Sequence, residues 1–334
     1  MDKRLILPVL CLIPALFVPQ ILEAIGEGFL IGLATRIVIY GIAAMSLNFI
    51  LGYGGMVSFG HAAYFGVGAY MVAILSHHAF EETTIFGLPG TDFAPMSFLV
   101  AIIVSAFAAL VIGALSLRTT GVYFIMITLA FAQMLFFLFV ALEHYGGDDG
   151  LLMFSGRNIL PGVDLSDDTT FYYVSIAVLV VVVALFSRLV RSRFGMVLEA
   201  CRQNEPRMRT LGYPVYRYKL TAFVIAGAIA GLAGALHANQ LEFISPDSLH
   251  WTRSGDLMIM VILGGIGRLY GPILGAALFL LLEEFLPVIF HELHLPTLQE
   301  HWRIVFGPML ILFVFYAKDG LAGLFSTRKE GEAT

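Results

Sequence analysis

Charged residues are scarce in this chain of 334 residues, where they make up only 13% of the sequence. Soluble domains carry about 25%. Apolar residues reach 59%, and the mean hydropathy is +0.87. This balance excludes an ordinary soluble domain and favours a polytopic membrane protein. The net charge of −5 is modest, and no nucleic-acid partner is expected.

Cysteine and lysine are also rare, and both shortages exclude classes of chemistry. The two cysteines, Cys11 and Cys201, fall in an apolar segment and a basic loop, so no disulfide framework is expected. None of the four lysines follows a glycine, which rules out a phosphate-binding GxxxxGK[ST] loop. Any ATP hydrolysis must therefore take place on another chain, and no cofactor is expected in this one.

Two short motifs resemble metal sites but lack the necessary ligands. The run HELHL begins at His291, but Leu295 occupies the position where a zinc-protease helix needs its second histidine. The run GGDDG at 146–150 lacks the alternating carboxylates of a calcium loop. We therefore expect neither a metal site nor a catalytic site, and the chain is not expected to be an enzyme.

Long apolar segments define the expected architecture, because a membrane-spanning helix needs about 20 residues. We expect an all-α polytopic protein of about ten transmembrane helices, at 5–22, 28–51, 55–75, 95–117, 121–142, 170–190, 218–240, 254–269, 271–286 and 303–317. The eighth and ninth segments are short, so nine or eight spans remain possible if one is re-entrant. The first resembles a signal peptide, but three prolines interrupt it and no cleavage site follows.

Basic residues predict the orientation of these spans. Most of the 19 lysines and arginines fall in loops that share one side of the membrane with the N-terminus, and the opposite loops are mostly acidic. By the positive-inside rule both termini are cytoplasmic. We expect one transmembrane domain over residues 1–325, followed by a polar tail over 326–334.

The run from Gly52 to Leu75 is rich in glycine, alanine and serine and carries no acidic or basic residue. Ser58, Ala62 and Gly66 recur every four residues, which predicts one helix face of small residues for close packing against other spans. Together with polar and glycine positions elsewhere, this run supplies the candidate residues of a translocation path: Asn48, Gly54, Gly55, Ser58, Gly60, His61, Gly264 and Gly265.

The longest basic loop lies at 194–217. Its composition predicts a helix, then Asn204 near the cap of a second short helix opened by Pro206, which Gly212 and Pro214 end. One interpretation is a loop that only sets the topology. The other is a cytoplasmic helical hairpin on which a soluble partner docks.

Four segments resemble the LivM-type permease of branched-chain amino acid ABC importers: GYGGMVSFGHAAYFGVGAY, the run from RSRFGMVLEACRQNEPRMRT to LAGAL, SPDSLHW and MVILGGIGRLYGPILGAAL. They occur in this order over nearly the whole chain. The chain departs from the family at Asp149, where the external glycine run has asparagine, and at Asp256, where glutamate is common.

The resemblance implies a transport subunit in a bacterial inner (plasma) membrane whose cargo is leucine, isoleucine or valine. It also implies three kinds of protein partner, namely a second LivH-type permease, two ABC ATPases that bind ATP and Mg, and a periplasmic binding protein, with membrane lipid around the complex. Coupling to the ATPase is then expected at Glu199, Ala200, Arg202, Asn204, Glu205, Leu211 and Gly212.

Other cargo and other mechanisms stay open at this point. Permeases for urea or short amides look similar, and an ion-coupled carrier could use Arg36 or His61, since ionisable groups inside a membrane are costly. For Arg36 we favour a structural ion pair, for His61 a simple hydrogen bond, and for Gln133 a hydrogen bond between helices.

Overall fold

The computed structural model describes residues 16–22, 28–85, 88–293, 301–316 and 320–324. Within them the regular secondary structure is helical apart from four two-residue strands. The longer helices are α2 (Leu30–Asn48), α3 (His61–Phe80), α4 (Ala94–Ser116), α5 (Val122–Val140), α6 (Asp168–Arg191), α7 (Arg193–Gln203), α9 (Val215–Leu241), α10 (Trp251–Gly264), α11 (Gly271–Glu292) and α13 (Trp302–Tyr316). The shorter elements are η1 (Phe49–Tyr53), η2 (Glu143–Tyr145), α8 (Glu205–Thr210), η3 (Pro246–Leu249) and α14 (Leu321–Leu324).

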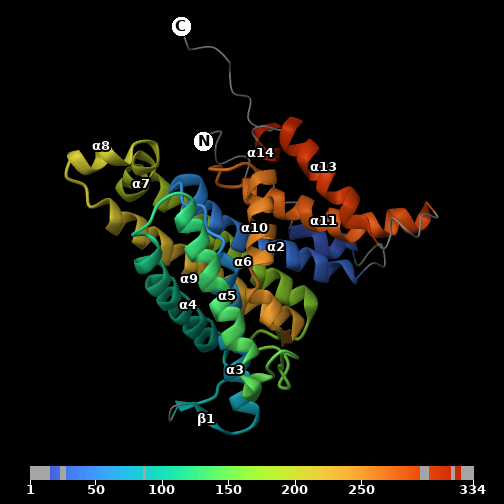
Figure 1. The fold of residues 1–334 in the computed structure, drawn as a ribbon. Helices are drawn as coiled ribbons and strands as arrows, with labels where there is room; N and C mark the ends of the chain where they lie inside the picture. The colour runs from blue at the N-terminus through green and yellow to red at the C-terminus, as the bar shows by residue number, and fades with distance from the viewer. Residues whose placement is uncertain (1–15, 23–27, 86–87, 294–300, 317–319, 325–334) are drawn as a thin grey trace.

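The strands form two small antiparallel pairs that lie in connections between helices. β1 (Thr84–Ile85) pairs with β2 (Leu88–Pro89), and β3 (Leu151–Leu152) pairs with β4 (Phe243–Ile244), with Leu151 opposite Ile244. Figure 1 shows α7 and α8 at one end of the molecule, the end that also carries α14, and the β1 strand at the opposite end.

Six helices are long and apolar enough to cross a membrane: α2 continued by η1, α4, α5, α6, α9 and α11. They fall on six of the ten expected spans. α3 has 20 residues and falls on the expected third span, but it is not among these six. The eighth and tenth segments form shorter helices, with 14 residues in α10 and 15 in α13. Only 16–22 of the expected first span is described, and the expected tail at 326–334 and both chain termini lie outside the described residues.

The expected third span, 55–75, is wrong at its start. α2 ends at Asn48 and runs into a π-helical turn, η1, after which residues 54–60 are not helical and α3 begins at His61. Gly55 has φ +67°, a conformation that favours glycine and breaks the helix there. Ser58 therefore lies before the helix, so the expected face of Ser58, Ala62 and Gly66 is not a single helical stripe.

Close helix packing does occur at glycines of α3 and α9. A Cβ at Gly68 would lie 2.1 Å from the carbonyl oxygen of Gly231, and one at Gly234 would lie 1.8 Å from that of Phe65. At Gly66 the nearest atom is in the Leu249 side chain, at 2.4 Å. Small residues thus let the backbones of α3 and α9 touch, as close packing between membrane helices requires.

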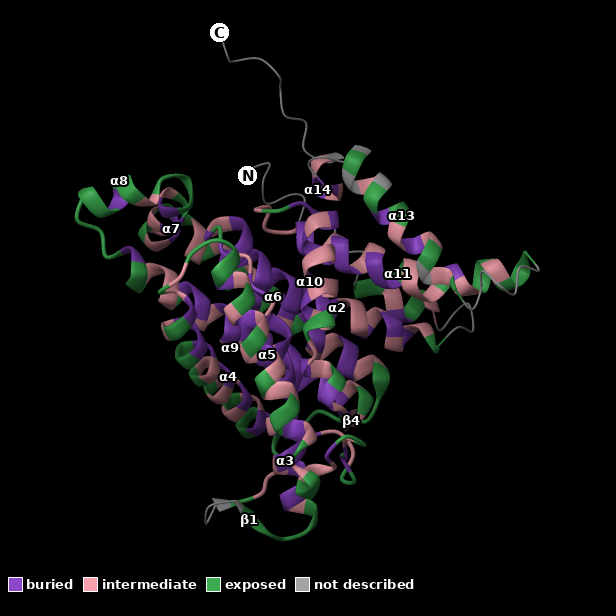
Figure 2. Ribbon diagram, in the orientation of Figure 1, coloured by how far each residue is buried: buried purple, intermediate pink, exposed green. Residues whose placement is uncertain are grey.

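Burial separates inner helices from outer ones. In the most apolar windows of α2 with η1 and of α9, 67% of residues are buried, against 22% to 28% for α4, α5, α6 and α11. Figure 2 shows the buried residues gathered along the centre and the exposed ones along the outer sides of α4 and α5. The outer faces are apolar nonetheless, with Phe107 and Phe137 among the exposed side chains, so they are suited to lipid or to another membrane subunit.

Three expectations about single polar residues are confirmed. Arg36 forms an ion pair with Glu283, with Nη2 to Oε2 at 3.2 Å. Gln133 of α5 contacts His250, the residue that caps the start of α10, at 3.3 Å, and His61 Nε2 lies 2.7 Å from the Ser46 hydroxyl. Cys201 is a buried free thiol, and Cys11 lies outside the described residues.

Candidate functional site

The basic segment forms the predicted helical hairpin, α7 followed by α8. The Ser192 hydroxyl accepts a hydrogen bond from the Gly195 amide and caps α7, and the Asn204 side chain accepts one from the Arg207 amide and caps α8. Gly212 has φ +85°, and its amide donates to the Arg209 carbonyl, which closes the end of α8. The sequence predicted the Asn204 cap and the end at Gly212, because Asn and Gly are residues that such ends prefer, whereas the Ser192 cap is seen only in the structure.

The hairpin buries a small apolar core and exposes apolar side chains at its far surface. Cys201, Met208 and Val215 are buried together beneath it. Leu211 is 63% exposed and Met196 is 58% exposed, although both are large apolar residues. Exposed apolar side chains among charged ones are typical of a surface that binds another protein.

Glu205 and Glu199, both predicted coupling residues, lie in different environments. The Glu205 carboxylate bonds to Lys219 and to Arg209, each at 2.5 Å. Partial burial raises the pKa of Glu205, but the hydrogen bonds and charges of Lys219 and then Arg209 outweigh it, so this pKa is lowered. Glu199 is exposed and makes no hydrogen bond or ion pair within the described part of the chain. Glu205 therefore ties α8 to α9, and Glu199 faces outward.

Arg202 connects α7 to the membrane bundle. Its Nη1 donates a hydrogen bond to the Gly52 carbonyl in η1, and its side-chain carbons lie so close to Gly55 that a Cβ there would be 2.9 Å from Cγ. The carbonyl acceptor lies in the π-helical turn, where the usual backbone pairing is interrupted. The hairpin and the bundle are thus joined where Arg202, a predicted coupling residue, contacts Gly55, a predicted path residue.

Asn48 extends this contact to the turn between α10 and α11. Its side-chain oxygen accepts from the Gly267 amide at 2.9 Å, and its side-chain nitrogen donates to the Arg268 carbonyl at 2.9 Å. A Cβ at Gly52 would lie 2.5 Å from the Gly267 nitrogen, so the two backbones are in contact. We call this set of contacts, from Arg202 through Gly52 to Asn48 and Gly267, the coupling junction.

The glycines Gly264 and Gly265 lie next to the coupling junction. A Cβ at Gly264 would lie 1.9 Å from the Gly271 carbonyl oxygen, and Gly265 has φ +109°. A Cβ at Gly320, which precedes α14, would lie 2.4 Å from the Gly265 nitrogen, and Arg268 donates to the Ala322 carbonyl. These positions need glycine for close backbone crossing.

The remaining predicted path residues are packed against protein. Gly54 follows η1, and a Cβ there would be 2.7 Å from the Ile50 carbonyl oxygen. The Ser58 hydroxyl accepts from the Gly60 amide at 3.2 Å, and a Cβ at Gly60 would lie 2.9 Å from the Thr128 carbonyl oxygen. His61 is fully buried and lies edge-on to Tyr64. None of the eight predicted path residues lines either of the two cavities described next.

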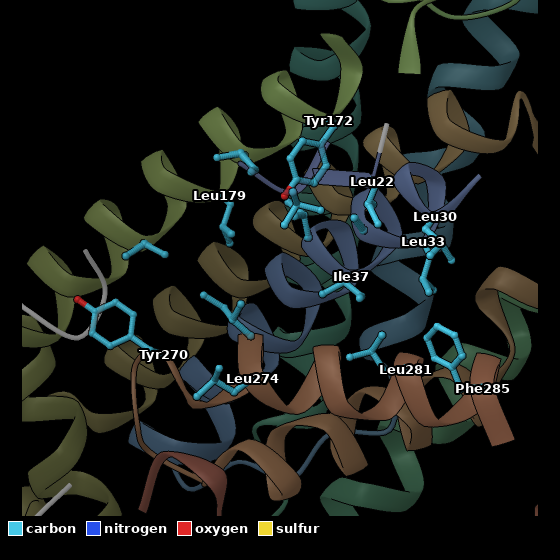
Figure 3. Close-up of a pocket in the computed structure, with 16 residues that line it drawn as sticks. Leu22, Leu30, Leu33, Ile37, Tyr172, Leu179, Tyr270, Leu274, Leu281 and Phe285 are labelled. Atoms are coloured by element: carbon cyan, nitrogen blue, oxygen red, sulfur yellow. The ribbon is translucent and has the colours of Figure 1, made fainter. Parts of the chain in front are cut away.

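The first cavity is apolar and has a volume of about 350 Å³. Figure 3 shows its lining from α2, α6 and α11, with leucines and isoleucines around it and the rings of Tyr172, Tyr270 and Phe285 at its edges. No charged side chain lines it. It can hold an aliphatic chain, but it cannot compensate the charges of a zwitterion.

The second cavity is polar and has a volume of about 340 Å³, within the range of roughly 300–1,000 Å³ common for small-molecule sites. It carries two guanidinium groups and two carboxylates beside apolar side chains. Its lining is Phe29, Gly32, Leu33, Thr35, Arg36, Arg157, Asp168, Phe171, Gln240, Leu241 and Glu284. Leu33 also lines the apolar cavity.

The sequence analysis found only Arg36 among the charged residues of this polar cavity. The signal for Glu284 was present, since Glu283 and Glu284 form an acidic pair inside an otherwise apolar helix. Arg157 and Asp168 had no such signal, because they lie in or beside a loop where charge is ordinary. Their meeting with α2 and α9 depends on tertiary packing.

Comparison with known proteins gives a consistent family. Residues 29–314 match the family described as the permease component of the branched-chain amino acid transport system. The high-affinity branched-chain amino acid transport system permease protein LivM of Salmonella typhimurium is 31% identical over 315 residues, which cover 87% of this chain and 69% of that protein. The protein of the same name in Escherichia coli is also 31% identical, with the same coverage.

More distant relatives match over a similar part of the chain. The permease protein BraD of Pseudomonas aeruginosa is 24% identical, over 85% of this chain and 91% of that protein. No solved structure matches the chain.

Proposed function

The chain belongs to the family of branched-chain amino acid ABC transport permeases, and from this membership we propose that it carries leucine, isoleucine and valine across the membrane. It is a multi-pass membrane protein, and permease components of this kind are not enzymes. The observation that carries the proposal beyond the family is the coupling junction, because it links an exposed helical hairpin to backbone inside the bundle.

The proposed complex contains a second LivH-type permease, two ABC ATPases that bind ATP and Mg, and a periplasmic binding protein. Apolar faces on α4 and α5 support a further membrane subunit or lipid as neighbours. In the proposed topology ten spans leave both termini in the cytoplasm of a bacterial cell, and the hairpin lies on the cytoplasmic side, where the basic residues gather.

In the proposed mechanism, ATP binding moves the ATPase against the α7–α8 hairpin. Glu199, Ala200 and the exposed Leu211 receive the partner, and the caps at Asn204 and Gly212 keep the hairpin in shape. Arg202 then transmits the movement through Gly52 to the turn after α10. The bundle changes between outward-open and inward-open states because the partners bind these states with different affinities.

The test below also distinguishes two alternative functions. A urea or short-amide permease would have the same architecture with another cargo. A cavity with both signs of charge favours a zwitterion over a neutral amide. An ion-coupled carrier is disfavoured, because Arg36 is already paired with Glu283 and His61 with Ser46.

The test is uptake by the complex reconstituted in proteoliposomes with its ATPase, second permease and binding protein. We expect ATP-dependent uptake of leucine that persists when ionophores remove ion gradients, and no uptake of urea. Uptake that follows an ion gradient without ATP would overturn the proposal, and so would uptake of urea in place of leucine.

Glu199→Lys tests the docking role within the same assay. It reverses an exposed charge, so we expect an assembled complex whose uptake is lost. Arg118→Glu reverses a charge in the α4–α5 connection and is the matched control. Normal uptake by Glu199→Lys would contradict docking at this surface.

A further inference from the structure

The polar cavity is assembled from segments far apart in the sequence. α2 contributes Arg36, the end of α9 contributes Gln240 and Leu241, and α11 contributes Glu284. The connection before α6 contributes Arg157, whose side chain is only 8% exposed. In the proposed topology all four meet in the outer half of the membrane. A cavity built from several elements is typical of a binding site.

The two guanidinium groups of this cavity differ in how fully they are used. Arg157 donates to Asp168 and to the Leu165 carbonyl, lies 3.5 Å from Glu242, and stacks over the Phe171 ring. Arg36 makes one hydrogen bond, to Glu283, out of the five that a guanidinium can donate. Arg36 therefore has donors left for an anionic group, and Arg157 holds the wall in place.

Two groups of this cavity that could accept hydrogen bonds from a cation remain unpaired. Glu284 is partly buried and makes no hydrogen bond or ion pair with any described residue. The side-chain oxygen of Gln240 is buried without a hydrogen-bond partner, although its nitrogen donates to the Gly32 carbonyl at 2.6 Å. Ionisable groups within a membrane domain are costly and mark function when they lack a partner.

We propose that this cavity binds the substrate α-amino acid directly, with Glu284 and Gln240 receiving its α-ammonium group and Arg36 its α-carboxylate. Leu33 and Leu241 supply apolar surface for an aliphatic side chain. Because Leu33 also lines the apolar cavity, the two spaces adjoin where such a side chain would extend. This inference rests on the proposed function and adds the residues that recognise the substrate inside the permease.

The experiment measures how far small molecules protect a cysteine at the cavity from alkylation. It uses the complex of both permeases and the two ATPases, without the binding protein. Both native cysteines are replaced and Leu241→Cys is introduced, since Leu241 lies at the cavity and is 52% exposed. The probes are leucine, 4-methylpentanoate, which lacks the ammonium group, and isoamylamine, which lacks the carboxylate. The readout is the rate of alkylation by a maleimide.

We expect leucine to slow alkylation. The concentration of each analogue that gives the same protection should be at least about tenfold higher, because each analogue lacks one charged group and loses about one charge-assisted hydrogen bond. Glu284→Gln should raise the half-protecting leucine concentration by about the same factor and leave that of 4-methylpentanoate unchanged. Glu143→Gln, on an exposed external turn, should change neither. If Glu284 had a purely structural role, Glu284→Gln would raise the half-protecting concentrations of leucine and of 4-methylpentanoate together.

Three results would overturn the proposal: no protection by leucine, equal protection by 4-methylpentanoate, or an unchanged leucine preference in Glu284→Gln. If that variant does not assemble, Glu284→Asp replaces it, and this variant should keep the preference for leucine because it keeps the carboxylate. Loss of the cavity site with normal leucine uptake refutes this inference alone. Absence of leucine uptake by the wild-type complex refutes the proposed function.

Discussion

Arg202→Met tests the coupling junction with the least disturbance to packing. Methionine keeps an unbranched apolar side chain beside Gly55 but removes the donor to the Gly52 carbonyl. A hydrogen bond from a charged group contributes about 1.5–3 kcal/mol, and partial exposure of this one reduces the figure to about 1.4 kcal/mol. A loss of that size changes an equilibrium about tenfold.

The assay is the number of leucine molecules imported per ATP hydrolysed in proteoliposomes. If Arg202 transmits the ATPase movement, Arg202→Met should lower that ratio about tenfold while assembly and ATP hydrolysis persist. Arg118→Met removes a cytoplasmic arginine away from the hairpin and serves as the control. An unchanged ratio for Arg202→Met would refute transmission through this contact, and loss of assembly would show that the contact is needed for folding instead.

Three further predictions concern packing, capping and topology. Gly68→Leu should block assembly more strongly than Gly66→Leu, as measured by size-exclusion chromatography of the complex. A side chain at position 68 would clash with the backbone of α9, whereas one at position 66 would meet the Leu249 side chain, which can move. Gly212→Ala should destabilise the end of α8 by about 1–2 kcal/mol because of its positive φ, seen as faster hydrogen exchange in the hairpin, and Gly212→Pro should abolish coupling. Cysteines at Asp164 and Arg207 should react with impermeant reagents from opposite sides, and reaction of both from one side would contradict the ten-span topology.

Local chemistry made much of the fold predictable. Apolar length predicted six helices that are long enough to span, and the helix ends at Asn204 and Gly212 followed from cap preferences. The break after η1 was missed because Gly54 and Gly55 stand inside a continuous apolar run. Hydropathy does not distinguish a broken segment from a whole one.

Candidate site residues were harder to predict for a different reason. Asn48 and Gly264, which the sequence predicts to lie on the translocation path, hold backbone segments together in the structure, and their role in the path stays a prediction. The polar cavity combines residues from distant parts of the chain, including Arg157 and Glu284. Only tertiary packing brings these together, and no local spacing encodes it.

The glycine contacts limit which parts of the molecule can move relative to one another. α3 and α9 touch through backbone at Gly68 and Gly234, and α10 and α11 touch through backbone at Gly264 and Gly275. Contacts without intervening side chains have no rotamers to change, so each pair should travel as one rigid body. Displacements during the transport cycle then fall at the side-chain contacts between α2 and α9, because the backbones of Gly52 and Gly267 tie the end of the α2 span to the turn between α10 and α11. The polar cavity lies along α2, so relative motion of the two bodies would change its width directly.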